Sequence, residues 1–330
     1  MGSEVWRRLA LCSLAASLTA VGVAWSASVA DNYPARPVRV VVPFVPAGPA
    51  DYNARLMGQR LGEAWGQQFI VDNRPAAGGL VGTDLVAKAS PDGHTLVMGN
   101  PGPMTIAPSV QKKMPYDPLR DLTPVIVITM STSFTTVHPG VPAKSVQELI
   151  ALAKAKPGEL KYGTPGVATV GHMTMAMFDH MAGTRTTHVP YKGVAAALTD
   201  LLAGQIEIAT MNPPMTLAHT KTGKIRAIGF NGLKRSEHLP EIPTMDEQGL
   251  RGFHSTNWNS VLAPAKTPRE IVNKLNRAIN ARVLTAETIK ILVSLGYEPG
   301  GGEPEMHAEM LRADTAKWAL VAKVAGVKVE

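Results

Sequence analysis

The feature that most constrains the fold is a regular alternation that begins after residue 31. Short apolar runs rich in β-branched residues alternate with amphipathic stretches of helical periodicity. This alternation predicts an α/β protein with mainly parallel sheets. The predicted strands are Val38–Val42, Phe69–Val71, Thr95–Met98, Val125–Thr129, Phe134–Val137, Lys161–Tyr162, Thr187–Val189, Ile206–Thr210, Arg226–Gly229 and Val261–Leu262.

Three of the predicted helices carry clear boundary signals. Ser145 is followed three residues later by Glu148 and then by apolar residues, which is the signature of a capping box at a helix start. A second helix is predicted over Val194–Leu202, with Gly204 as its stop signal. The chain is predicted to close with a long helix over Pro304–Val324.

Two segments indicate that the chain crosses between two lobes. Residues 121–136 hold two consecutive apolar β runs with no helix between them, and residues 253–264 form a second irregular β segment that leads back into helix. Two crossings predict a discontinuous first lobe, 31–132 plus 256–330, and a second lobe, 133–255. A ligand pocket is then expected in the cleft between the lobes.

Residues 1–30 read as a secretory signal peptide. A basic start at Arg7 and Arg8 precedes an apolar run too short to span a bilayer, and Ser28, Val29 and Ala30 form a small-residue cleavage pattern. We expect export and cleavage after Ala30. Cleavage would also remove Cys12, the single cysteine of the chain, and so exclude a disulfide or a thiol nucleophile from the mature protein.

Composition argues against several functional classes. The net charge of +7 is spread along the chain without a Lys/Arg run, so nucleic-acid binding is not expected. The chain has no Walker loop, no H-E-x-x-H, no G-x-S-x-G and no G-x-G-x-x-G after the first strand, and its nine histidines are scattered. We therefore predict no enzyme activity, no cofactor and no metal. A secreted hydrolase with Ser, His and Asp brought together by folding stays an open alternative.

The segment VRVVVPFVPAGPAD, residues 38–51, has the pattern of a strand aimed at a ligand. Its valines fit a buried strand, its prolines end that strand, and Gly48 allows close approach of the backbone. A helix is predicted to begin near Asp51. The exposed amides and the dipole at such a helix start favour an anion such as a carboxylate or phosphate.

Four further segments accompany this one in order along the chain: 73–79 (NRPAAGG), 90–96 (SPDGHTL), 115–118 (PYDP) and 188–193 (HVPYKG). Together they resemble the periplasmic solute-binding proteins of the tripartite tricarboxylate transporter system, the Bug family. The resemblance implies a two-lobed type II periplasmic-binding-protein fold that closes on its solute like a Venus flytrap. It also implies a periplasmic location and delivery of a small carboxylated solute to a membrane permease.

The resemblance also implies where the solute would bind. In this family the first-lobe loop and the helix after it hold a carboxylate, and the second-lobe loop over residues 163–172 faces them. Two more loops, each after a strand, are expected to close the pocket. The predicted ligand-binding residues are Phe44, Ala47, Gly48, Asp51, Asn100, Thr164, Thr169, His172 and Asn212.

Two positions depart from the family pattern. Ala47 stands where the family has the first of two glycines, which predicts a narrowed approach or a changed backbone angle. Asn212 stands near a position where many relatives carry aspartate, so a ligand amine would lose its partner. We therefore favour a di- or tricarboxylate, or an aromatic acid of the phthalate type, over an amino acid.

Several residues have competing interpretations. Arg74 could donate hydrogen bonds to a ligand carboxylate, but a turn-stabilising role is favoured. Asp51 would repel a carboxylate that it faced, so capping of its own helix is favoured. Trp258 is expected to fill the core rather than to stack on a ligand. The protein is expected to be monomeric, and presentation of the bound solute to a sensor kinase is a further alternative to transport alone.

Overall fold

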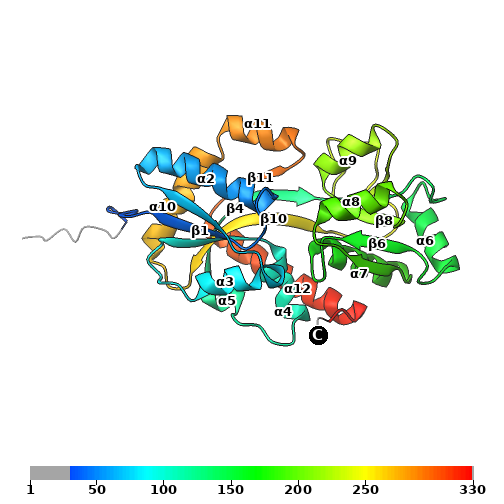
Figure 1. The fold of residues 1–330 in the computed structure, drawn as a ribbon, viewed down its shortest axis with the longest axis horizontal. Coiled ribbons are helices and arrows are strands. Elements are labelled where there is room, and N and C mark those ends of the chain that lie inside the picture. The colour runs from blue at the N-terminus through cyan, green and yellow to red at the C-terminus, as the bar shows by residue number, and fades with distance from the viewer. Residues whose placement is uncertain (1–29, 329–330) are drawn as a thin grey trace, which may run out of the picture.

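The computed structural model describes residues 30–328, which form two mixed β-sheets covered by helices, one sheet in each half of the molecule (Figure 1). The predicted signal peptide lies outside the described residues except for Ala30. The strands are β1 Val38–Val42, β2 Phe69–Asn73, β3 Thr95–Gly99, β4 Leu122–Thr132, β5 Phe134–Val137, β6 Lys161–Thr164, β7 Thr187–Pro190, β8 Ile208–Met211, β9 Arg226–Phe230, β10 Thr256–Pro264 and β11 Glu298–Gly301.

The first sheet has the strand order β11-β4-β10-β3-β1-β2. β1 lies parallel to both β2 and β3, with Val40 paired to Val71 on one side and to Leu96 on the other. β10 lies antiparallel between β3 and β4, and β11 pairs antiparallel with the outer side of β4. We call this sheet and its helices the first lobe.

The second sheet has the order β7-β6-β8-β5-β9 and defines the second lobe. β6 lies parallel to β7 and β8, whereas β5 is antiparallel to both β8 and β9. The expectation of mainly parallel sheets is therefore wrong, although the α/β class is confirmed. The reason is the crossing: β5 follows β4 after the single residue Ser133, and β10 returns beside β4 in the opposite direction.

Helices pack on both faces of each sheet. They are α2 Pro49–Trp65, α3 Leu80–Ala87, α4 Ala107–Val110, α5 Pro118–Asp121, α6 Val146–Ala155, α7 Val170–Ala182, α8 Val194–Leu202, α9 Pro213–Thr220, α10 Arg269–Ala278, α11 Ala286–Ser294 and α12 Pro304–Ala325, with short helical segments η1 Ala77–Gly79, η2 Gly102–Ile106 and η3 Ile279–Val283. In the part of the chain that the structure describes, no helix is long and apolar enough to cross a bilayer.

Helix starts follow the predicted capping chemistry. Ser145 caps α6 by accepting the amide of Glu148 at 3.2 Å. The Glu148 carboxylate reaches back to the amide of Lys144, one residue before the cap. The Val194–Leu202 helix has the predicted bounds, and the closing helix extends one residue beyond its predicted end.

The closing helix α12 belongs to the cores of both lobes. Near its start, Leu311 packs against the first sheet together with Trp258. Near its end, Trp318 joins a core that contains Phe178 of α7 and Val137 of β5. Figure 1 shows α12 lying along the junction of the two halves, next to α7. The lobes therefore share apolar packing on this side of the molecule.

The two crossing segments, Ser133 and residues 231–255, are tied together by one buried side chain. Asn231 is fully buried, and its carboxamide accepts from the hydroxyl of Thr135 at 2.9 Å and donates to the hydroxyl of Ser133 at 2.9 Å. Its backbone amide donates to the Ser133 carbonyl, and its carbonyl accepts from Ser255. This cluster fixes where the chain leaves one sheet and enters the other.

Candidate functional site

The loop between β1 and α2 is held in shape by Asp51. This carboxylate lies in the first turn of α2 and is buried. It accepts hydrogen bonds from the Ala47 amide at 3.0 Å, from Asn73 Nδ2 at 3.0 Å and from Arg55 Nε at 2.9 Å. These donors, with Arg55 contributing most, lower the pKa of Asp51. Asp51 therefore acts on the loop itself, but as the third residue of α2 and not as its N-cap, which is Gly48.

The same loop presents backbone donors at the start of α2. Helix α2 begins at Pro49, two residues earlier than the sequence indicates, with Gly48 in extended conformation as its N-cap. Within residues 30–328, the amides of Gly48, Ala50 and Asp51 have no hydrogen-bond partner. Unpaired amides at a helix start, reinforced by the helix dipole, form a site for an anion.

Phe44 and Asn100 lie beside this loop on the first lobe. The Phe44 ring closes over Gly79, where an added Cβ would lie 3.2 Å from both the ring and Pro103. Asn100 accepts the Gly102 amide at 3.1 Å through its side-chain oxygen. The loops after β1, β2 and β3 thus pack against one another. Glycine suits position 79 because it has no side chain, which allows Phe44 and Pro103 to come this close.

The second-lobe loop between β6 and α7 is also tied internally. The hydroxyls of Thr164 and Thr169 both donate to the Gly166 carbonyl, at 3.0 and 2.8 Å. Thr169 is the N-cap of α7, and the Ala168 amide donates to His172 Nδ1 at 3.2 Å. Both hydroxyls donate within the loop, and contact of Thr164 and Thr169 with a solute stays a prediction.

His172 stacks on His188, which is not among the predicted ligand-binding residues. The rings of His172 and His188 stack with centroids 4.0 Å apart and planes 9° apart, and His188 Nε2 lies 2.6 Å from the Thr164 hydroxyl. Burial lowers the pKa of each histidine to about 4, and for His172 the neighbouring His188 adds to the effect. Both imidazoles are therefore neutral at neutral pH and act as part of the loop's support.

Asn212 lies at the start of α9, where few backbone amides can donate a hydrogen bond. It caps α9 by accepting the Met215 amide at 3.3 Å, and the next two residues are Pro213 and Pro214, which have no amide hydrogen. This end of the second lobe therefore offers less to an anion than α2 or α7, where the amides of Val170 and Gly171 have no partner within the described chain.

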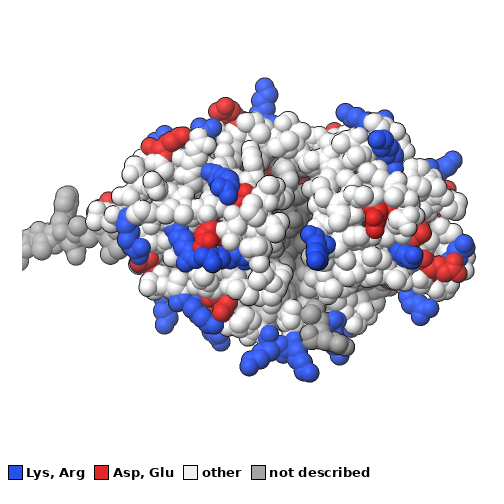
Figure 2. Space-filling view, viewed as in Figure 1, with Lys and Arg blue, Asp and Glu red and all other residues white. Residues whose placement is uncertain are grey.

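The nine predicted residues are divided between the two lobes. Phe44, Ala47, Gly48, Asp51 and Asn100 form the first group, and the second consists of Thr164, Thr169, His172 and Asn212. Across residues 30–328, no hydrogen bond or ion pair joins the two groups. Figure 2 shows a groove between the two halves of the molecule.

Backbone strain is concentrated in these loops. Of the four non-glycine residues with positive φ among those described, three are alanines beside the candidate site: Ala47 at 64°, Ala77 at 47° and Ala168 at 58°. Ala47 thus keeps the left-handed angle that suits glycine instead of changing it. Strain of this kind costs about 1–2 kcal/mol per residue and is typical of functional loops.

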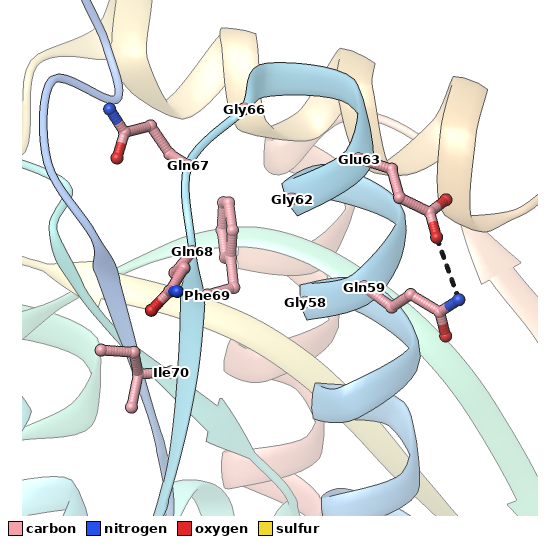
Figure 3. Close-up of a pocket in the computed structure, with 9 residues that line it drawn as sticks. All are labelled: Gly58, Gln59, Gly62, Glu63, Gly66, Gln67, Gln68, Phe69 and Ile70. Atoms are coloured by element: carbon pink, nitrogen blue, oxygen red, sulfur yellow. Dashed lines mark hydrogen bonds between the residues drawn. The ribbon is translucent and has the colours of Figure 1, made fainter.

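A second concavity, of about 480 Å³, lies on the first lobe between α2 and β2 (Figure 3). It surrounds the C-terminal half of α2, about 15–25 Å from the amides at the start of this 17-residue helix. Its polar side chains do not converge, because Gln59 bonds to Glu63 on one side and Gln67 and Gln68 lie on the other (Figure 3). Phe69 and Gly58, which both line it, pack closely: an added Cβ at Gly58 would lie 3.1 Å from the Phe69 Cβ.

Comparisons with known proteins place these features in a family. The model of the tripartite tricarboxylate transporter family receptor matches residues 53–327. Protein BugT of Bordetella pertussis is 33% identical over 302 residues, which cover 91% of this chain and 93% of BugT.

Two solved structures with ligands are similar in fold. Rpa4515 of R. palustris, solved with adipate, is 38% identical with a TM-score of 0.82 and covers 90% of this chain and 99% of its own. MatC of Rhodopseudomonas palustris, with bound malate, is 29% identical with a TM-score of 0.79 over 88% and 99% of the two chains. The two-lobed periplasmic-binding fold expected from the sequence is confirmed, and the chain belongs to the tripartite tricarboxylate transporter receptor family of solute-binding proteins.

Proposed function

We propose that this protein captures a small dicarboxylate between its two lobes in the periplasm and delivers it to the permease of a tripartite tricarboxylate transporter. The observation that carries the proposal is the pair of helix starts, one on each lobe, with unpaired amides in loops that are otherwise hydrogen-bonded internally. The adipate and malate bound to two similar proteins agree with this choice.

Backbone amides, rather than basic side chains, are proposed to bind the carboxylates. Arg55 is paired with Asp51, and Arg74 is paired with Asp72 at 2.9 Å. Both neighbouring guanidinium groups are therefore engaged within the first lobe, which supports the turn-stabilising interpretation of Arg74. Amides fixed by the fold replace the water around a carboxylate without the entropy cost of ordering a long side chain.

An amine-bearing solute fits this arrangement less well. The carboxylate of Asp51, which lies nearest to the candidate donors, already accepts three hydrogen bonds. The Asn212 oxygen is occupied by the Met215 amide. An ammonium group placed between the loops would therefore lose its water without gaining an anionic partner, which costs several kcal/mol for a buried charge.

The transport step is proposed to depend on closure of two bodies, 31–132 plus 256–330 and 133–255, about the crossing segments. A solute that binds both loop groups at once stabilises the closed form selectively, and this closed form is what a permease could recognise. Family membership favours this binding role over the hydrolase alternative.

Thermal unfolding and calorimetry with a solute panel test the proposal. Adipate, malate, citrate and phthalate are compared with glutamate, and a ligand present at about 100 times its Kd should stabilise the protein by about 2.7 kcal/mol. We expect the amine-free acids to raise the melting temperature and glutamate, which carries an ammonium group beside its two carboxylates, not to. Tight binding of glutamate without binding of the amine-free acids would refute the proposed solute class.

The Gly48→Val variant tests the location of the site. Gly48 has φ −85°, and an added Cβ would lie 3.7 Å from its nearest neighbour, so the loop can accept a side chain. The valine methyl groups would then obstruct the amides at the start of α2. We expect a folded variant with at least tenfold weaker binding, while the exposed Ala195→Val control binds normally. Undiminished binding by folded Gly48→Val would remove this loop from the site.

A further inference from the structure

A separate cavity of about 640 Å³ lies between the lobes beside the crossing strands. Its walls come from Met130 and Thr132 at the end of β4, from Thr256 and Trp258 at the start of β10, and from the loop that follows β9. None of the nine predicted ligand-binding residues lines it. Its volume falls in the range of sites that hold small molecules.

The strand orders place this cavity and the candidate cleft on opposite sides of the crossing. In the first sheet, the cleft loops follow β1 and β3 on one side of β10, whereas β4 and β11 lie on the other side. In the second sheet, the cleft loop follows β6 on one side of β5, whereas β9 lies on the other. The crossing strands therefore form a pivot between the cleft and the cavity.

The lobes touch directly at one end of the cavity, where α9 begins. Gly296, in the turn before β11, lies so close to Pro213 at the start of α9 that an added Cβ would collide with the proline ring. Both residues line the cavity. Because Pro213 directly follows Asn212 of the second predicted group, this contact lies where the cavity borders the cleft.

A hydrogen-bonded chain fixes the floor of the cavity to the crossing strands. Thr132 donates to Glu298 at 3.2 Å, its oxygen lies 3.0 Å from the Thr256 hydroxyl, and Thr256 lies 2.9 Å from His254 Nε2. Because the Thr132 hydroxyl donates to Glu298, the chain runs from His254 through Thr256 and Thr132 to Glu298. It joins β4, β10 and β11 beside the cavity.

The lining is apolar in its walls and neutral in total charge. Tyr297 is the half-buried aromatic residue of the lining, whereas Trp258 and Phe230 lie behind the wall with 2% and 6% of their surface exposed. Three basic and three acidic side chains balance each other: Lys234, Arg235, Lys317, Glu237, Glu298 and Asp314. This lining suits an uncharged aromatic group better than an ion.

We propose that this cavity is a control site whose occupation by an uncharged aromatic group favours the closed cleft. Material in the cavity holds the far sides of the lobes apart, and because the crossing strands act as the pivot, the cleft loops move together. Since only the closed form contacts the solute from both lobes, raising its population tightens solute binding. The inference rests on the proposed function, because it assumes that the cleft loops bind the solute.

A tryptophan introduced from the wall tests this control site. Val293 on α11 lines the cavity, is half-buried and belongs to no core cluster, so Val293→Trp places an indole in the cavity. Ile291→Trp on the same helix is the matched control, since Ile291 is 44% exposed and lies outside the cavity. We expect Val293→Trp to lower the Kd for adipate by about threefold or more and Ile291→Trp to leave it unchanged. An unchanged or higher Kd in folded Val293→Trp would overturn the proposal.

Free indole tests the chemical class of the occupant. We expect millimolar indole to tighten adipate binding to the unmodified protein and to have no effect on Val293→Trp, whose cavity is already filled. Failure of indole to change adipate binding by the unmodified protein would overturn the assignment of an aromatic occupant.

A distance measurement without solute separates failure of this inference from failure of the proposed function. Spin labels on cysteines at Gln59 of α2 and Thr199 of α8, both exposed, report lobe separation. We expect a shorter mean distance in Val293→Trp than in Ile291→Trp even if no solute of the panel binds. Equal distances in the two variants would overturn the coupling between cavity and cleft, whatever the solute proves to be.

Discussion

Replacing His307 with leucine is expected to stabilise this protein. His307 lies in the first turns of α12 with 2% of its surface exposed and packs edge-on against Trp258, with ring centroids 5.9 Å apart. Among the residues described, neither of its ring nitrogens has a hydrogen-bond partner. A buried polar group left in this state costs about 1–3 kcal/mol, and leucine of similar volume removes that cost while it keeps the apolar contact.

The stabilisation by His307→Leu should be larger at acidic pH than at neutral pH. Burial lowers the pKa of His307 to about 3, against 6.5 for the exposed side chain. Below pH 6.5 the unfolded chain binds a proton at His307 that the native protein does not bind. The free energy of unfolding therefore falls by about 1.4 kcal/mol for each pH unit. The advantage of His307→Leu over the unmodified protein should therefore be about 2 kcal/mol larger at pH 5 than at pH 7.5. The buried His172 and His188 are present in both proteins and cancel in the comparison.

Urea denaturation at pH 7.5 and pH 5 measures the free energy of unfolding of each variant and its change with pH. The matched control is His180→Leu, since His180 is exposed near the end of α7. At pH 7.5 we expect the free energy of unfolding to be about 1–3 kcal/mol higher for His307→Leu than for the unmodified protein. A destabilisation of more than about 1 kcal/mol, or a difference in stability that does not change between the two pH values, would refute the reasoning.

Three further changes test the loops and the crossing. Asn231→Ala should lower the free energy of unfolding by about 2–4 kcal/mol, because two buried side-chain hydrogen bonds of the crossing segments lose their partner; urea denaturation measures it. Ala47→Gly should raise it by about 0.5–1 kcal/mol by removing the left-handed strain, as scanning calorimetry would detect. His172→Phe keeps the stack on His188 but loses the acceptor for the Ala168 amide, so solute affinity in titration calorimetry should fall about tenfold.

Elements with strong local signals could be predicted from the sequence. The valine-rich β1 has its predicted bounds, and so does α8, whose apolar residues lie on one face and whose glycine stop, Gly204, adopts φ 70°. In both cases the local preference and the tertiary environment require the same structure. Trp258 was predicted to belong to the core, and at 2% exposure it does.

Strand β11 could not be predicted in this way. Its sequence, Glu298-Pro299-Gly300-Gly301, has no β preference, and the strand exists because the edge of β4 pairs with it. A Cβ at Gly300 would collide with the Val127 carbonyl, so glycine is needed there for close approach to β4 rather than for a turn. Partners distant in the sequence decide this strand, as they decide the antiparallel placement of β10.

The candidate site shows the same division between local and distant information. The strand-to-helix pattern identified the first-lobe loop, and the resemblance to the family identified the second-lobe loops. Gly48, Thr169 and Asn212 are each a helix N-cap in the structure. The roles of the side chains depended on partners elsewhere in the chain. His188 supports His172 from another strand, and Asn73 reaches Asp51 from β2, and neither contact has a signal in the local sequence.

Internal hydrogen bonds in both loops limit which groups are free to bind a solute. Asp51, Thr164 and Thr169 use their polar atoms to fix the backbone, which leaves amides as the groups proposed to bind carboxylates. An amide presents the same donor whatever its side chain, so the loop motifs encode a carboxylate-binding backbone and carry no information about the rest of the solute. Selection among acids must then come from apolar side chains of the same loops, of which Val45 and Val167 are 62% and 46% exposed. Changes at these two valines should shift the preference between aliphatic and aromatic acids while carboxylate binding persists.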